Sequence, residues 1–115
     1  MRKITYTPDA SDKLRKMKTV ISQEYGLESA NKVIKSIADA IKGLAEYAEK
    51  GIRVSNMFDT ATDYRYLFVS KNYVFYRIEG KYIRIINIYH EKEDFMWQLF
   101  GVGTTPQETI DYWDE

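Results

Sequence analysis

The chain has 115 residues, enough for one domain with a buried core and too few for two domains of ordinary size. Hydrophobic residues make up 44% and charged residues 30%, a balance that excludes an intrinsically disordered chain. The 17 basic and 17 acidic residues cancel, which argues against nucleic-acid binding through bulk charge alone.

The charges are unevenly distributed along the chain. The last twelve residues contain four acids and no Lys or Arg, so residues 1–103 hold 17 basic and 13 acidic residues and carry a net charge of +4. We therefore expect a single domain over residues 1–103 and an acidic C-terminal extension over residues 104–115. No apolar run approaches the roughly 18 residues that a membrane-spanning helix needs, which predicts a cytoplasmic protein that does not bind membranes.

The first half of the chain shows the signals of one strand and two helices. Residues 3–7 alternate β-branched and aromatic side chains and predict a strand, and Thr7-Pro8 is a typical helix start. A helix with one apolar, buried stripe is predicted from this start to Tyr25, because apolar residues recur at three- and four-residue spacing: Ala10, Leu14, Met17, Ile21 and Tyr25. Gly26 ends it. A second helix is predicted from residue 29 to about residue 50, ended by Gly51, so the two helices should form an antiparallel hairpin.

The second half changes to the pattern of a sheet. Residues 51–63 lack a sustained period and are expected to form a loop. Segments rich in Tyr, Phe, Ile and Val predict strands over residues 64–69, 73–79 and 82–89. Helices are expected over residues 92–100 and, briefly, after the cap signal at residue 104. This order predicts an α+β fold, with the helical hairpin packed on a mainly antiparallel four-stranded sheet and a short C-terminal helix.

The two-residue connection Gly80-Lys81 suits a turn with positive φ at its first position and sets the register of the last two strands. Arg77 should then lie opposite Arg84. Side-chain alternation predicts one face, buried under the helices, that carries Val74, Tyr76, Ile78, Ile83 and Ile85. It predicts a second, open face that carries Tyr73, Phe75, Arg77, Arg84, Ile86 and Ile88.

Two segments resemble RelE/ParE-type toxins, which are also known as plasmid stabilisation proteins. NYVFYRIEGKYIRIINIYHEKEDF, at residues 72–95, is similar to their strand hairpin and following turn, and YTPDASDKLRKM, at residues 6–17, is similar to their first strand and helix start. The resemblance covers roughly residues 3–100. It implies a RelE/ParE-like fold and a toxin of a type II toxin-antitoxin system, neutralised by a cognate antitoxin that wraps its surface.

The resemblance leaves the target open, because RelE-like members cut messenger RNA on the ribosome and ParE-like members inhibit DNA gyrase. RelE-like nucleases commonly carry an arginine where this chain has Tyr73, and their basic residues on the preceding strand are reduced here to Arg65. The basic cluster after the last strand is reduced to His90 and Lys92, with three acids beside them that repel phosphate. These departures favour a ParE-like toxin over a ribonuclease.

Two features carry a functional interpretation beside an ordinary one. His90, the only histidine, could be a general acid or base, or could make a structural hydrogen bond. Arg77 and Arg84 repel each other across the ladder, so an anion should compensate them. That anion could be Glu79 or a loop acid, or else a nucleic-acid phosphate or an acidic antitoxin segment. One histidine and no cysteine make a metal site improbable, and no cofactor motif is present.

Three hypotheses follow. In the first, the toxin binds a protein target such as gyrase through a working face made of Arg65, Tyr73, Phe75, Arg77, Arg84, His90 and Lys92. In the second, it is a ribosome-dependent endoribonuclease, where Lys92, Arg77 and Arg65 stabilise phosphate charge and His90 assists proton transfer. In the third, it is an inactive relative that acts as a binding module. Whether the chain is an enzyme depends on which of these holds.

Overall fold

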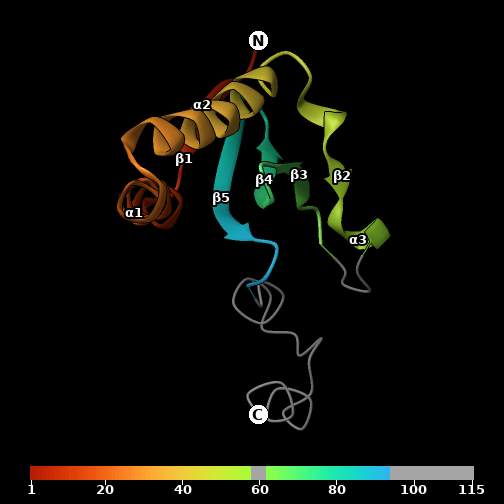
Figure 1. Ribbon diagram of the computed structural model, residues 1–115. Helices are drawn as coiled ribbons and strands as arrows, with labels where there is room; N and C mark the ends of the chain where they lie inside the picture. The colour runs from red at the N-terminus through yellow and green to blue at the C-terminus, as the bar shows by residue number, and fades with distance from the viewer. Residues whose placement is uncertain (58–61, 94–115) are drawn as a thin grey trace, which may run out of the picture.

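The computed structural model describes residues 1–57 and 62–93 and has a sheet with a helical hairpin on one face (Figure 1). The sheet has the strand order β1-β5-β4-β3-β2, in which β1 runs parallel to β5 and the other neighbours are antiparallel. Its strands are β1 (Lys3–Tyr6), β2 (Ile52–Arg53), β3 (Arg65–Val69), β4 (Asn72–Glu79) and β5 (Tyr82–His90). The α+β class and the mainly antiparallel sheet are as predicted, although the described residues form five strands rather than four.

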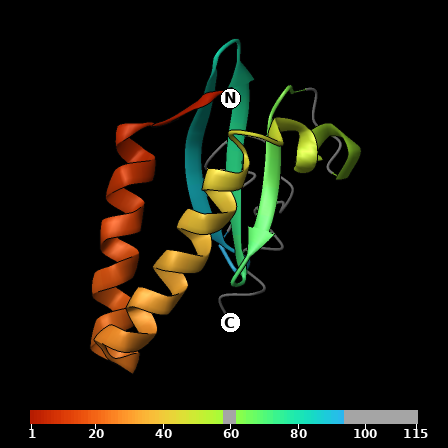
Figure 2. The same cartoon turned by 90° about the horizontal axis from the view of Figure 1, so that it is seen from above.

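The two long helices are α1 (Pro8–Tyr25) and α2 (Leu27–Gly43), joined at Gly26. Figure 2 shows both helices on the same side of the sheet. Their apolar stripes bury a core against β4 and β5. Helix α2 and the two strands contribute mainly Ile and Val, whereas α1 contributes Ala10, Leu14 and Met17. The fully buried members of this core include Ile37, Ile41, Leu44, Val74, Tyr76, Ile83, Ile85 and Ile88.

Helix α2 is shorter than predicted, because the chain turns towards the sheet after Gly43. The amides of Leu44 and Ala45 donate to carbonyls three residues back, which tightens the last turn, and a 3-10 helix, η1 (Ala48–Lys50), follows. The side chain of Tyr76, in β4, anchors residues 48–51 to the sheet. Its hydroxyl donates to the Ala48 carbonyl at 2.7 Å and accepts the Gly51 amide at 3.0 Å.

Two-residue turns connect the three long strands. Gly80 has φ +58°, the positive value expected at the first position of the Gly80-Lys81 turn. Ser70 and Lys71 also have positive φ, at 51° and 64°, so the β3–β4 turn occupies a conformation that glycine and asparagine adopt more easily. Asn72, expected in this connection, is instead the first residue of β4, and its side-chain amide donates to the Ser70 carbonyl at 2.8 Å.

A β-bulge in the β4–β5 ladder alters the predicted register. The pairs Ile78–Ile83, Arg77–Arg84 and Tyr76–Ile85 are as expected, but Phe75 pairs with Asn87 instead of Ile86. Ile86 is therefore the extra residue of β5, and every later side chain of that strand changes face. Ile88, expected on the open face, consequently lies in the core under the helices.

The N-terminus of α1 covers the bulge. Thr7 is the N-cap of α1, as predicted, and its hydroxyl accepts the Ala10 amide at 3.1 Å. The same hydroxyl donates to the Ile86 carbonyl at 2.6 Å, while the Thr7 amide donates to the Ile85 carbonyl at 3.1 Å. The Thr7 hydroxyl thus satisfies the Ala10 amide in the first turn of α1 and the Ile86 carbonyl at the bulge.

The segment over residues 51–63, expected to be a loop, also differs from its prediction, because part of it forms a strand and a helical turn. Ile52 and Arg53 form the edge strand β2 beside β3, and a helical turn, α3 (Val54–Met57), follows with Val54 fully buried. A two-residue strand carries too little sequence pattern to be recognised. The helices expected over residues 92–100 and after residue 104 lie, apart from Lys92 and Glu93, outside the described residues.

Candidate functional site

The face of the sheet turned away from the helices, here called the outer face, carries Tyr73, Phe75, Arg77 and Arg84. Arg77 and Arg84 lie opposite each other, as predicted. The Arg77 guanidinium hydrogen-bonds the Asp63 carboxylate at 3.0 Å, lies 3.9 Å from Glu79 and sits over the Tyr64 ring at 5.6 Å. The hydrogen bond to Asp63 raises the pKa of Arg77. A loop acid and Glu79 therefore compensate this arginine, which is the ordinary interpretation of the pair.

Arg84 differs from Arg77 in its surroundings. Its side chain is exposed, and it forms no ion pair within residues 1–57 and 62–93. Because Arg77 is held by two acids, Arg84 is the cation of this pair that remains available for a partner. It is the better candidate for a contact with a target.

The aromatic residues of the outer face form a second cluster. The cluster consists of Val54, Tyr66, Phe75 and Tyr89, with Tyr64, Tyr73 and Ile86 packed against it. Phe75 was expected on an open face, but it is fully buried, with its ring centroid 6.0 Å from those of Tyr66 and Tyr89. Tyr73 is half-buried and packs edge-on against Tyr66 and Phe68. Phe75 therefore supports the fold and is not an exposed contact residue.

Arg65 lies on the other face of the sheet. It pairs with Tyr76, and directly opposite residues of an antiparallel ladder point to the same face, here the one that the helices cover. Its guanidinium donates to the carbonyls of Glu49 and Gly51 at 3.2 and 3.1 Å, so it holds η1 and the start of β2. The expectation that Arg65 shares a working face with Arg77 and Arg84 was wrong.

The bulge also changes the position of His90. Since Ile88 points into the core, His90 points to the same side, towards α1, and the register pairs it with Asn72. Its Nδ1 accepts the amide of Lys92 at 3.2 Å, and its own amide donates to Glu93 at 3.0 Å. Glu93 in turn forms an ion pair with Lys13 of α1 at 2.7 Å. His90 therefore makes the structural hydrogen bond that was the alternative to catalysis, while the Lys92 side chain is exposed.

A groove that sequence reasoning missed lies beside His90. It has a volume of about 730 Å³ and runs between α1 and the end of the sheet formed by Ser70, Asn72 and His90. Met17, Val20, Ile21 and Tyr25 of α1 line it, with Val33 of α2. Val20 is 51% exposed and Tyr25 71%, although Tyr25 was expected on the buried stripe of α1. The sequence carried one sign of this groove. Val20 is apolar but lies outside the predicted stripe, so it adds an apolar side chain next to Ile21.

In the part of the chain that the structure describes, no three His, Asp or Glu side chains gather in a way that could hold a metal ion. In the same part, no helix has the length and apolar character needed to cross a membrane.

The fold is similar to that of a chain in a solved structure described as the chromosomal ParDE TA system from P. aeruginosa. The TM-score is 0.67 at 23% sequence identity, and the match covers 78% of this chain and 96% of that chain. The family model of the ParE toxin of type II toxin-antitoxin system, parDE, matches residues 4–95. No curated protein is similar enough in sequence to count as a match.

Because the family model covers most of the chain, the protein belongs to the ParE toxin family of type II toxin-antitoxin systems. The resemblance to RelE/ParE toxins is thereby confirmed. The match includes every candidate residue discussed above, from Arg65 to Lys92.

Proposed function

We propose that this toxin stops bacterial growth by binding a protein target, DNA gyrase, and that a cognate antitoxin neutralises it. The proposal depends on how the residues that a ribonuclease would use are distributed. His90 and Arg65 lie on the helix side of the sheet, while Arg77 and Arg84 lie on the outer face. Side chains on opposite faces point away from each other and cannot converge on one phosphate.

The hydrogen bonds that Arg65, Arg77 and His90 make within the fold also argue against a ribonuclease. Arg65 donates to two backbone carbonyls, Arg77 is held by Asp63, and His90 Nδ1 already accepts the amide of Lys92. Each of these three side chains thus has a partner within the fold, whereas a ribonuclease needs them directed at the substrate. We assign Arg84, with the half-buried Tyr73 on the same face, to contact with the protein target.

Induced expression in a bacterial host tests this proposal. Plasmid supercoiling should fall while messenger RNA stays intact, and co-expression of the adjacent gene should restore growth. His90→Asn should remain toxic, because an Asn side chain can accept the same backbone amide without acid-base chemistry near neutral pH.

An Arg84→Glu variant provides the matched comparison, because Arg84 is exposed and free of ion pairs among the described residues. It should lose most gyrase inhibition in a purified supercoiling assay while it keeps its fold by circular dichroism. Early cleavage of messages, with loss of toxicity in His90→Asn, would instead establish the ribonuclease. Absence of toxicity in the wild-type chain would favour the inactive relative.

We assign the antitoxin to the groove along α1. The groove is open, and Met17, Val20, Ile21, Tyr25 and Val33 give it an apolar surface against which the apolar side chains of an antitoxin segment can pack. Val20→Glu should weaken binding of the adjacent gene's product by at least about tenfold, because it buries an unpaired charge in the contact.

Thr19→Glu is the control for this change, because Thr19 is also exposed on α1 but does not line the groove. Isothermal titration of the purified toxin variants measures both dissociation constants. Equal weakening by the two substitutions would exclude the groove as the antitoxin site.

A further inference from the structure

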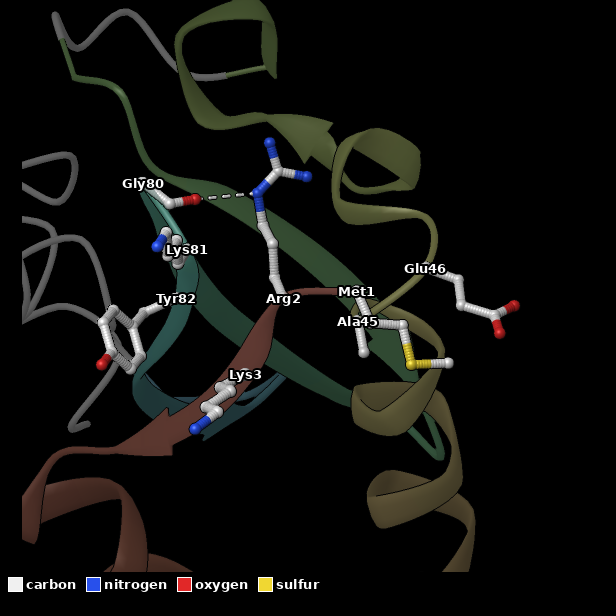
Figure 3. Close-up of a pocket in the computed structure, with 8 residues that line it drawn as sticks. All are labelled: Met1, Arg2, Lys3, Ala45, Glu46, Gly80, Lys81 and Tyr82. Carbon is white, nitrogen blue, oxygen red and sulfur yellow. Dashed lines mark hydrogen bonds between the residues drawn. The ribbon is translucent and has the colours of Figure 1, made fainter.

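A cavity of about 830 Å³ lies at the end of the sheet opposite to His90 (Figure 3). Three segments that are distant in sequence form it: the start of β1, the β4–β5 turn and the turn after α2. Backbone hydrogen bonds hold them together, because the Arg2 amide donates to Ala45 at 3.0 Å and the Lys3 amide donates to Lys81 at 2.8 Å. The cavity is therefore part of the folded structure.

Basic side chains surround this cavity. Arg2, Lys3 and Lys81 are all exposed, and none forms an ion pair within the described ranges of the chain. The Nε of Arg2 donates to the Gly80 carbonyl at 3.0 Å, which fixes the guanidinium and leaves its two Nη groups without a described partner. Glu46 is the acid at the rim, and Figure 3 shows its carboxylate directed away from the three cations.

An aromatic ring lies among these cations. Tyr82 lines the cavity, is 47% exposed, and pairs with Lys3 across the parallel β1–β5 ladder, so both point to the same face of the sheet. Cations that neutralise phosphates, together with an exposed aromatic ring on which a base can stack, are the combination that single-stranded nucleic acids need. An acidic protein segment would use the cations but would gain no stacking from Tyr82.

We propose that this basic cavity binds the phosphodiester backbone of a single-stranded nucleic acid, with Arg2, Lys3 and Lys81 on the phosphates and Tyr82 stacked on a base. The cavity shares no lining residue with the α1 groove. Arg84 does not line it either, but Arg84 follows Tyr82 by two residues of β5 and lies on the same face of the sheet. The proposed binding does not require the proposed action on gyrase. Binding at this position needs no cleavage chemistry.

The test measures fluorescence anisotropy of a labelled oligothymidine of about 12 nucleotides with the purified full chain at several salt concentrations. Lys3→Gln/Lys81→Gln should weaken binding and reduce the slope of log affinity against log salt by about 1.4, since each phosphate contact on a single strand contributes about 0.7. Lys16→Gln/Lys18→Gln removes the same charge from exposed positions of α1 and should leave the slope nearly unchanged. Thermal unfolding checks that all variants are folded.

Stacking is tested separately. Tyr82→Ala should weaken binding of the single strand by about fivefold or more, whereas Tyr25→Ala, which truncates a more exposed tyrosine on α1, should not. Equal effects of the two lysine pairs, or of the two tyrosine changes, would overturn the proposal. If polyglutamate competed as strongly per charge as the oligonucleotide, the ligand of the cavity would be an acidic protein. If duplex DNA bound more tightly than the oligonucleotide, a single strand would be excluded as the ligand. None of these readouts depends on toxicity, so they leave the proposed function untouched.

Discussion

Replacing Tyr76 by phenylalanine is expected to lower the free energy of unfolding by about 3 kcal/mol. The Tyr76 hydroxyl is buried and joins two backbone groups, the carbonyl of Ala48 and the amide of Gly51. Phenylalanine removes both hydrogen bonds and leaves these groups buried without partners, and each unsatisfied group costs about 1–3 kcal/mol. Urea denaturation followed by circular dichroism measures the difference.

Tyr47→Phe is the control for this prediction, because Tyr47 is 67% exposed and its hydroxyl can bond to water. Its effect should stay within about 0.5 kcal/mol. Gly51→Ala should be as damaging as Tyr76→Phe, since a Cβ at residue 51 would overlap the Tyr76 hydroxyl. If both Tyr76→Phe and Gly51→Ala changed the free energy of unfolding only slightly, the stability of the 48–51 segment would not depend on Tyr76.

The same site predicts a dependence on pH. Burial raises the pKa of Tyr76 above the ordinary tyrosine value near 10. A raised folded-state pKa means that the stabilisation is fully present below the unfolded pKa and is lost as the pH rises through the folded pKa. The difference in stability between wild type and Tyr76→Phe should therefore narrow above about pH 10.

Thr7→Val is expected to lower the free energy of unfolding by about 2 kcal/mol. Valine has the shape of threonine but can neither accept the Ala10 amide nor donate to the Ile86 carbonyl. Loss of an N-cap costs about 1 kcal/mol, and the unsatisfied carbonyl at the bulge adds a similar amount. Thr7→Ser keeps the hydroxyl and should cost less than about 0.5 kcal/mol.

Thermal unfolding of the two Thr7 variants, side by side, makes this comparison. Equal destabilisation by valine and serine would mean that the methyl group, and not the two hydrogen bonds, accounts for the role of Thr7. Hydrogen exchange at Ala10 provides a local readout, because its amide is the one that the Thr7 hydroxyl accepts.

Strong local signals were sufficient for much of the fold. The start of α1 follows from Thr7-Pro8, and the turn at Gly80 sets the first four residue pairs of the β4–β5 ladder. The bulge at Ile86 could not be predicted, because β5 contains no glycine to mark it, and Asn87 beside it is the one residue next to the bulge that disfavours a strand. The predicted second helix continued to about residue 50, whereas α2 ends at Gly43. Residues 48–50 form a separate 3-10 helix, which the Tyr76 hydroxyl holds from a strand far along the chain.

The candidate site was predicted less well, because the face on which each side chain lies depends on the strand register. Strict alternation put His90 on the face of Arg77 and Arg84, and one extra residue in β5 moves it to the other. Arg65 was misplaced because its strand pairs with β4 in a register that the short β3–β4 turn determines. Arg77 was understood correctly as a pair with Arg84, and a loop acid, Asp63, proves to be its main partner.

The parallel pairing of β1 with β5 also has a consequence for synthesis of the toxin. Lys3–Tyr6 of β1 pair with Tyr82–Ile85 of β5, so the contacts that complete the sheet form only when nearly the whole domain has left the ribosome. Closing so long a loop slows folding, because its entropy is lost before the contact stabilises the fold. The sheet of the nascent toxin is therefore completed only after β5 has emerged, which makes folding of this domain a late event in its synthesis.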